Sequence, residues 1–340
     1  MSVYRESQIG AADVPRETAP PDQGQLGAVG AGEVLRPVSH NAMDTESQPP
    51  RDVGWTPIAE EAERATRVLH PGALRLPPPV RRRVMTVANQ KGGVGKTTST
   101  VNLAAALALH GLKVLVIDLD PQGNASTALG VDHRSGTPSV YEVLIGELAL
   151  ADAVAVSNQS DNLVCVPATI DLAGAEIELV SMVARESRLK EALSSEALDQ
   201  LKPDYVFIDC PPSLGLLTVN ALVAASEVLI PIQCEYYALE GLGQLLRNIE
   251  LVQAHLNPVL QVSTILLTMY DGRTKLADQV TSEVRGHFEE QTLRTVIPRS
   301  VKVSEAPGFG QSVLTYDPGS RGAMCYLDAA KELAERGAAR

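Results

Sequence analysis

Aromatic residues are scarce in this sequence. Its 340 residues include one Trp, three Phe and eight Tyr, so aromatics make up 4% while hydrophobic residues make up 44%. The core must therefore consist mainly of aliphatic side chains and alanine. The four cysteines lie far apart and without C-x-x-C spacing, which argues against a disulfide framework or a zinc site and fits a reducing compartment.

Long apolar runs and excess positive charge are also missing. No run approaches the length of a membrane span, and the N-terminus lacks a basic stretch followed by an apolar one. We therefore expect a soluble, cytoplasmic protein. The 29 Lys and Arg residues stand against 41 Asp and Glu, which gives a formal net charge of −12. Any contact with nucleic acid must then be a local basic patch on an acidic body.

The first eighty residues differ in composition from the rest. Eleven of the 22 prolines lie before Val80, among many Gly, Ser, Gln and acidic residues. Such a segment buries too little surface to offset its ordering entropy, so we predict that 1–80 is a disordered extension. Within it, Thr56 and Pro57 suit the start of a helix, and apolar residues recur on one face through 56–69. We predict a short helix there, either transient or used to dock a partner such as a cell-pole scaffold.

From residue 81 to the end, apolar segments alternate with amphipathic ones. The apolar segments are near-continuous Val, Ile and Leu runs, which indicates strands buried on both faces. The pattern predicts an α/β fold with a doubly wound, mainly parallel sheet in a single domain, 81–340. We expect strands near 84–88, 114–118, 163–167, 206–209, 228–231, 263–267 and 295–297. We expect helices at 97–109, 140–145, 172–183, 189–201, 216–225, 239–255, 276–288 and 321–335.

The segment 84–99, VMTVANQKGGVGKTTS, is the strongest functional signal. It combines an apolar strand, a glycine-rich loop and a helix start. Three glycines allow a sharp turn and close approach to a ligand, and the loop and helix N–H groups form an anion site. Lys96 would place its charge on the outer phosphates, and the hydroxyl of Thr97 would bind Mg²⁺. The usual P-loop pattern is altered, because Gln90 replaces its first glycine and a second lysine, Lys91, follows.

The stretch KGGVGKTT resembles the deviant Walker A motif of the ParA/MinD superfamily, and about 84–337 resembles chromosomal ParA (Soj-like) partition ATPases. The resemblance implies a P-loop NTPase fold, with ATP and Mg²⁺ as cofactors. In that family the lysine that matches Lys91 reaches the nucleotide of a second subunit, so two chains enclose two ATP molecules and basal hydrolysis is slow. Lys91 and Lys96 would thus assist catalysis. The nucleotide-binding residues implied for the loop are Lys91, Gly92, Gly93, Val94, Gly95, Lys96, Thr97 and Thr98.

Carboxylates follow two of the expected strands. KVLVIDLDPQGN places Asp118 and Asp120 at a strand end, and YVFIDCPPS places Asp209 at another, where ligands bind in parallel sheets. The resemblance assigns Asp120 to the Walker A′ motif, near Mg²⁺ and the attacking water, and Asp209 to Walker B. Metal contacts are thus expected from Thr97, Asp120 and Asp209. Alone, each Asp would fit an ordinary turn equally well.

Loops beside the phosphates and the base supply further candidates. Asn124 in DPQGN and Ser213 in DCPPSLG are either polar contacts to ATP or simple turn residues. No N-K-x-D guanine motif is present, which favours ATP over GTP. In the family the adenine lies near the segment that matches 296–310, so Pro298 and Arg299 would border it, unless this loop serves packing alone.

Several cations are candidates for DNA contact. Arg273 matches a family arginine implicated in DNA binding without sequence preference, and Lys302 stands where the family usually has arginine. Lys275 and Arg299 would add to this patch, because clustered cations contact phosphates without reading bases. Arg273 and Lys302 also fit solvated loop charges. The triplet 81–83 is a weaker candidate.

The favoured function is chromosome or plasmid partition. ATP-bound dimers would bind the nucleoid without sequence preference, and a ParB-type partner would stimulate hydrolysis and release them. One alternative is a MinD-like division-site ATPase on a membrane surface, although the C-terminal segment carries mostly alanine on its apolar side. Others are an iron–sulfur reductase, for which Cys210 and Cys234 do not match the required pattern, and a nucleotide switch that does not hydrolyse ATP.

Overall fold

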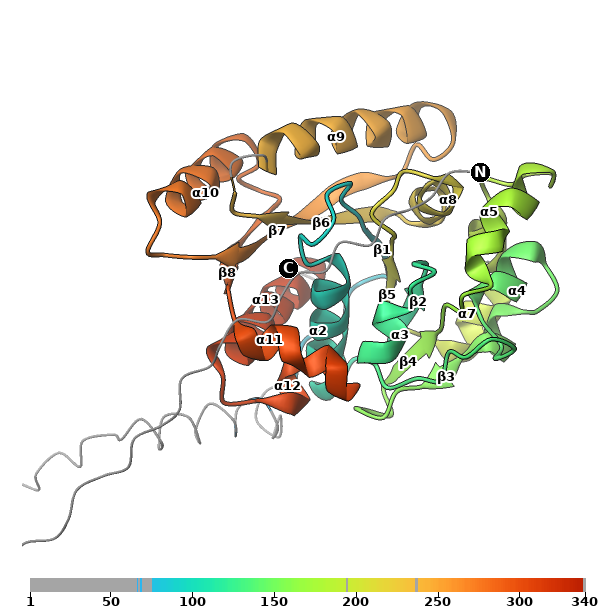
Figure 1. The fold of residues 1–340 in the computed structure, drawn as a ribbon, viewed down its shortest axis with the longest axis horizontal. Coiled ribbons are helices and arrows are strands. Elements are labelled where there is room, and N and C mark those ends of the chain that lie inside the picture. The colour runs from blue at the N-terminus through green and yellow to red at the C-terminus, as the bar shows by residue number, and fades with distance from the viewer. Residues whose placement is uncertain (1–65, 67, 69–74, 194, 236–237, 339–340) are drawn as a thin grey trace, which may run out of the picture. The chain divides into compact units, whose positions relative to one another are not determined.

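A mainly parallel sheet lies at the centre of the structure (Figure 1). The computed structural model describes residues 66, 68, 75–193, 195–235 and 238–338, and within these ranges eight strands pair in the order β3-β4-β2-β5-β1-β6-β7-β8. Every pairing is parallel except that of β3 with β4. The predicted fold class is therefore confirmed.

All seven predicted strands are present, with longer bounds for most of them. The eighth, β3, was not predicted, because two residues are too short to show a pattern. The strands are β1 (Arg83–Val87), β2 (Val114–Asp118), β3 (Ala155–Val156), β4 (Leu163–Val166), β5 (Tyr205–Asp209), β6 (Glu227–Gln233), β7 (Gln261–Tyr270) and β8 (Thr292–Pro298).

Helices connect the strands largely as predicted. The segment 189–201 forms two helices instead of one, and three short helices at 124–128, 301–305 and 313–316 were not predicted. The helices are α2 (Lys96–Leu109), α3 (Asn124–Ala128), α4 (Val140–Ile145), α5 (Leu172–Val180), α6 (Arg188–Ala192), α7 (Ser195–Leu201), α8 (Leu216–Ala224), α9 (Ala238–His255), α10 (Lys275–His287), α11 (Val301–Glu305), α12 (Val313–Tyr316) and α13 (Arg321–Gly337), with short 3-10 turns η2 (Leu150–Ala153) and η3 (Ala306–Phe309).

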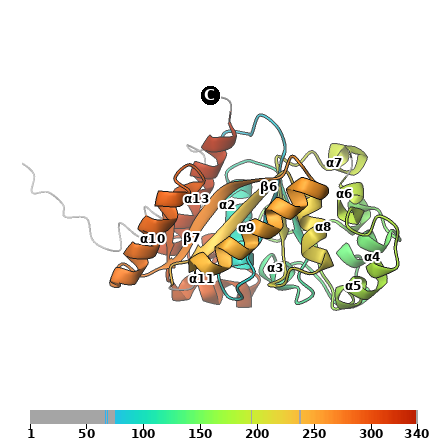
Figure 2. The same cartoon turned by 90° about the horizontal axis from the view of Figure 1, so that it is seen from above.

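The helices cover both faces of the sheet (Figures 1 and 2). Helices α8, α9 and α10 lie on one face, and α2 and α13 lie on the other. Alternate residues of β5 belong to separate hydrophobic clusters: Val206 and Ile208 pack on the first side, and Tyr205 and Phe207 on the second. This alternation is the physical reason why the strands read as continuous apolar runs.

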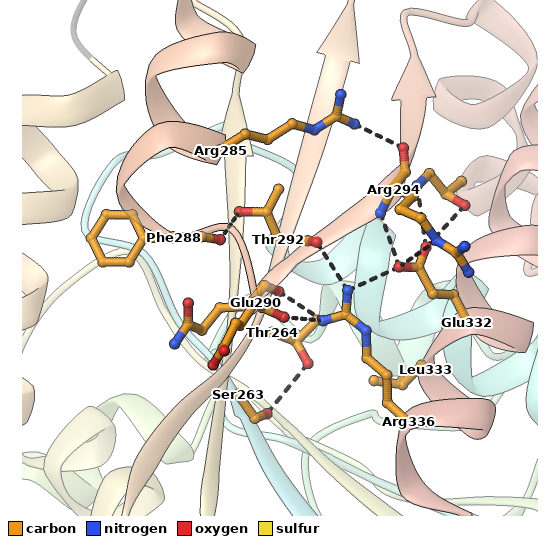
Figure 3. Close-up of polar contacts among 12 residues, drawn as sticks. Ser263, Thr264, Arg285, Phe288, Glu290, Thr292, Arg294, Glu332, Leu333 and Arg336 are labelled. Atoms are coloured by element: carbon orange, nitrogen blue, oxygen red, sulfur yellow. Dashed lines mark hydrogen bonds and ion pairs between the residues drawn. The ribbon is translucent and has the colours of Figure 1, made fainter.

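The edge strand β8 is held by polar contacts from α13 (Figure 3). The Glu332 carboxylate accepts hydrogen bonds from the backbone N–H groups of Arg294, at 2.9 Å, and Thr295, at 3.2 Å. Arg336, one turn later, donates to Glu332 and to three backbone carbonyls, those of Glu290, Gln291 and Thr292. These contacts fix the C-terminal helix on the sheet and satisfy N–H groups that an edge would otherwise expose.

The predicted extension 1–80 and its helix 56–69 lie almost wholly outside the described residues. Thr66 and Val68 are helical, and Val68 is buried. From residue 75 onward the chain is described: Leu76 is buried and its N–H donates to the His110 carbonyl, and Val80 N–H donates to the Gly337 carbonyl. The domain boundary at 80 stays a prediction.

Candidate nucleotide site

The loop between β1 and α2 has the backbone that the sequence predicts. Gly93 (φ 73°) and Gly95 (φ 90°) adopt left-handed conformations that favour glycine, and Gly95 is the N-cap of α2. Buried Val94 lies between them, and its carbonyl accepts a 2.8 Å hydrogen bond from the Thr268 hydroxyl on β7. The sequence did not reveal this link, because the two residues are far apart in the chain.

A cavity of about 720 Å³ opens beside this loop. Seven predicted nucleotide-binding residues line it, together with Asp120: they are Gly92, Gly93, Gly95, Lys96, Thr97, Thr98 and Asn124. Five further lining residues belong to segments that the sequence placed near the nucleotide without naming them singly: Gln122, Pro212, Ser304, Pro307 and Gly308. The sequence did not indicate the others, Val101, Asn102, Thr127, Ala128 and Met269. Lys91 is not among the lining residues.

Lys96 extends into a region of opposite charge. The residue is only 7% exposed, and its Nζ lies 3.5 Å from the Lys91 carbonyl. Burial lowers the pKa of Lys96, an effect opposed by the neighbouring Asp209, Cys210 and Asp120. The ammonium therefore occupies a site where the negative charge of a phosphate would compensate its lost hydration.

Asp209 is fully buried at the end of β5 and keeps one carboxylate oxygen available. Its Oδ1 accepts a 2.9 Å hydrogen bond from the Thr100 hydroxyl on α2. Its Oδ2 is buried without a hydrogen-bond partner within the described part of the chain. Burial, together with the nearby Asp118 carboxylate, raises the pKa of Asp209 to about 7. A buried carboxylate with an unpaired oxygen is stabilised by binding either a cation or a proton.

Asp118, unlike Asp209, has hydrogen-bond partners for both of its carboxylate oxygens. Its Oδ2 accepts hydrogen bonds from both the N–H (2.8 Å) and the hydroxyl (2.7 Å) of Ser126 in α3, and its Oδ1 accepts one from Asp120 N–H (3.2 Å). Burial nevertheless raises its pKa to about 6. Asp118 thus fixes the loop between β2 and α3 and so positions Asp120.

Asp120 itself borders the cavity. It is 8% exposed, and its Oδ1 accepts a hydrogen bond from Gln122 N–H. The Thr97 side chain also lines the cavity, and hydrogen bonding from it lowers the pKa of Asp209. The unpartnered Asp209 oxygen and the Thr97 hydroxyl are hard oxygen donors, which fit Mg²⁺ with most of its water shell retained.

Three comparisons with known proteins bear on this site. The AAA domain family AAA_31 matches residues 82–262. The sporulation initiation inhibitor protein Soj of Bacillus subtilis is 53% identical over 255 residues, 75% of this chain and 99% of Soj. The chromosome partitioning protein ParA of Caulobacter vibrioides (strain NA1000 / CB15N) is 51% identical over 255 residues, 75% of this chain and 94% of that protein. The chain belongs to the Soj/ParA family of chromosome partitioning proteins.

A solved structure agrees with Soj/ParA membership in fold. The cobyrinic acid a,c-diamide synthase of Mycobacterium smegmatis, with bound ADP and magnesium, has a TM-score of 0.62 and 41% identity, covering 73% of this chain and 92% of that one. The resemblance read from KGGVGKTT is thereby confirmed, as is the P-loop NTPase fold. The two relatives align with 75% of this Soj/ParA chain and with nearly their own full length.

The segment 296–310, which the sequence placed near the adenine, contributes Ser304, Pro307 and Gly308 to the lining of the cavity. Pro298 and Arg299 are not among the described residues that line it, so their contact with adenine stays a prediction. Pro307 and Gly308 belong to the 3-10 turn η3, which packs against α3. Met269 also lines the cavity and has a φ of 50°, a left-handed value that is uncommon for a side chain of this type.

The predicted DNA-binding cations lie on neighbouring loops. Tyr270 and Pro298 are register partners, so the loops that carry Arg273 and Arg299 leave adjacent strand ends. Arg273 is 88% exposed, but its guanidinium makes a two-point contact with Asp271, at 2.7 and 2.9 Å.

Two further cations of this group are exposed near these loops. Lys275 is exposed at the start of α10. Lys302 is also exposed, on α11, and pairs with Glu305 at 3.2 Å. The cations are therefore exposed, but two of them have acidic partners within their own loop or helix.

The weaker basic candidate, 81–83, has internal contacts. Arg83 pairs with the nearly buried Glu227 and donates to the Leu333 carbonyl. Arg82 donates to the carbonyls of Pro203 and Leu198. These two arginines connect the start of the central strand β1 to α7 and α13. Because their guanidinium groups have partners inside the protein, we do not include the triplet in a DNA-binding surface.

The sequence left open an iron–sulfur reductase and a membrane-surface ATPase, and the cysteines and helices bear on these two alternatives. Cys210 and Cys234 are buried, and the described ranges hold no group of three or more His, Cys, Asp or Glu side chains placed to hold a metal ion. Within the same part of the chain, none of the helices has the length and apolar character needed to cross a bilayer.

Proposed function

We propose that this chain is a partition ATPase that binds ATP with Mg²⁺ and hydrolyses it. One observation carries the proposal: a single cavity brings together the glycine loop, Lys96, Thr97 and Asp120, with the unpartnered oxygen of Asp209 beside them. These groups supply the cation, the metal ligands and the carboxylate that phosphoryl transfer requires.

Each residue has a role that follows from its position. The N–H groups of the loop and of the first turn of α2 bind the phosphates, and Lys96 neutralises their outer charge. Thr97 and Asp209 would hold the metal ion. Mg²⁺, when bound, supplies charge compensation on the phosphate oxygens. Asp120, at the rim of the cavity, orients the attacking water.

The partners follow from the resemblance to the family. Lys91 would reach the nucleotide of a second copy, so that two chains enclose two ATP molecules. The exposed Arg273, Lys275 and Lys302 would then contact DNA phosphates without base readout. Dimerisation would double these contacts and make DNA binding depend on ATP. A ParB-type partner would stimulate the slow hydrolysis and release the dimer from the nucleoid.

A membrane-surface function of the MinD type has less support. It would require an apolar C-terminal face that is free to enter a bilayer. In α13 that face is buried against the sheet and α2, through residues that include Tyr326, Leu327 and Leu333. Vesicle sedimentation with ATP tests this alternative: the partition function predicts that the protein stays in the supernatant.

The decisive experiment is ATP turnover with DNA and a ParB-type protein, added alone and together. We expect slow basal turnover and the largest rate when both are present. Binding of ATP with no turnover in any combination would instead support a switch that does not hydrolyse its nucleotide.

A further inference from the structure

Lys91, the lysine that begins the glycine loop, has its backbone fixed, and its side chain pairs with Glu235 and does not line the cavity. Its N–H donates to the Asn89 side chain at 3.0 Å, and the Asn89 amide donates to the Pro231 carbonyl in β6 at 2.8 Å. These two bonds tie the start of the loop to the neighbouring strand. The ammonium then meets Glu235, with Nζ 3.2 Å from Oε2.

Glu235 is itself held in place for this contact. It follows β6 directly, and its N–H donates to the Gln233 carbonyl at 2.8 Å. Its second carboxylate oxygen, Oε1, accepts a 2.6 Å hydrogen bond from the Gln233 side chain. Both oxygens of Glu235 therefore have partners, one from its own strand and one from Lys91. The pair lies at the surface, with side chains 35% and 48% exposed.

We propose that Glu235 is a positioning residue that holds Lys91 within its own subunit and so opposes dimerisation. The inference rests on the proposed function, in which Lys91 contacts the nucleotide of a second copy. One ammonium cannot keep close contact with Glu235 and also reach a phosphate across a dimer. The carboxylate thus competes with the triphosphate of the partner copy for the same lysine.

The strength of this competition suits a reversible control. Exposed ion pairs are weak, so releasing Lys91 from Glu235 would raise the dimer dissociation constant by about twofold to fivefold for each chain. Two chains lose one pair each on forming a dimer, which makes the combined effect about 4- to 25-fold in the dimer dissociation constant. A triphosphate carries more charge than one carboxylate and would displace Glu235. ADP, which lacks the outer phosphate, would leave the pair intact.

The test is sedimentation equilibrium of the full chain with Mg²⁺ and a slowly hydrolysed ATP analogue. Glu235→Gln should lower the dimer dissociation constant by about 4- to 25-fold. Gln233→Ala, which frees one oxygen of Glu235, should shift it by a smaller factor in the same direction. Affinity of the monomer for nucleotide should not change, because Glu235 does not line the cavity.

A matched control is Glu335→Gln. Glu335 also pairs with a lysine, Lys331, and is 50% exposed, but it lies on α13, away from the loop. This variant should dimerise as the wild type does. An unchanged or weaker dimer in Glu235→Gln would overturn the inference, as would an equal change in Glu335→Gln.

Failure of the inference and failure of the proposed function give different results. If the wild type dimerises with the analogue and Glu235→Gln dimerises equally, only the role of Glu235 is wrong. If the wild type and both variants remain monomeric at saturating analogue, the dimer itself is wrong and the role of Glu235 is excluded with it.

Discussion

Asp118 and Asp209 are register partners at the ends of the adjacent parallel strands β2 and β5, and both are fully buried. Their environments differ. Asp118 accepts three hydrogen bonds from the loop and helix that follow it, whereas one oxygen of Asp209 has no partner among the described residues. One carboxylate therefore holds the loop, and the other remains available for a cation.

This pair predicts a pH dependence of stability. Both pKa values are raised in the folded state, to about 6 and about 7, so the unfolded chain releases these protons first as pH increases. The folded state then holds more protons, and the free energy of unfolding should fall between about pH 4 and 7. Thermal denaturation without nucleotide should show a lower melting temperature at pH 8 than at pH 5.5.

Asp209→Asn is the variant that isolates this effect. It removes one of the two facing charges, so its melting temperature should depend less on pH than that of the wild type. A profile as steep as the wild type would show that other groups cause the dependence.

Asp120→Ala should separate hydrolysis from binding. Asp120 borders the cavity but makes no contact that holds the glycine loop, so nucleotide affinity should remain within about threefold while turnover drops by about a hundredfold or more. Fluorescent-nucleotide binding and phosphate release measure the two quantities. Normal turnover in this variant would refute the role assigned to Asp120.

Arg273→Glu should weaken DNA binding without affecting ATP binding. The structure suggests a second variant with the opposite expected effect, because the Asp271 carboxylate forms an ion pair with the Arg273 guanidinium. Asp271→Asn leaves the shape of the loop and frees the cation, so it should strengthen DNA binding and increase its salt dependence. Anisotropy of labelled duplex DNA, with an ATP analogue and at several salt concentrations, measures both. Equal affinity in all three proteins would remove Arg273 from the surface.

Glu332→Ala tests the contact between α13 and the edge strand. The substitution leaves two backbone N–H groups of β8 without their acceptor and removes one of the four acceptors of the Arg336 guanidinium, which should cost about 2–4 kcal/mol of unfolding free energy. The exposed Glu335→Ala should change it by less than about 0.5 kcal/mol. Urea denaturation measures both. Comparable effects would mean that the buried position of Glu332 confers no special stability.

The sequence predicted the sheet well because its strands are buried on both faces and so carry an uninterrupted apolar signal. The same chemistry predicted the glycine loop, since Gly93 and Gly95 stand where left-handed backbone is needed. Contacts made after distant segments meet left no local signal. The bond from Thr268 to Val94 and the place of Met269 in the cavity belong to this class.

Local pairs were missed for another reason. The sequence places Asp271 two residues before Arg273, but the spacing alone does not show whether the side chains meet or point into solvent. The same holds for Lys91, where the sequence shows a second lysine and the structure shows the acidic residue that receives it.

In the proposed mechanism, the glycine loop binds a triphosphate and Lys91 contacts the nucleotide of a second copy. Light scattering at saturating nucleotide tests it most directly. We expect a mass near 36.1 kDa with ADP and near twice that value with the slowly hydrolysed analogue and Mg²⁺, and a Lys91→Ala variant that binds the analogue but stays at the lower mass. The same mass with both nucleotides in the wild type would contradict the account.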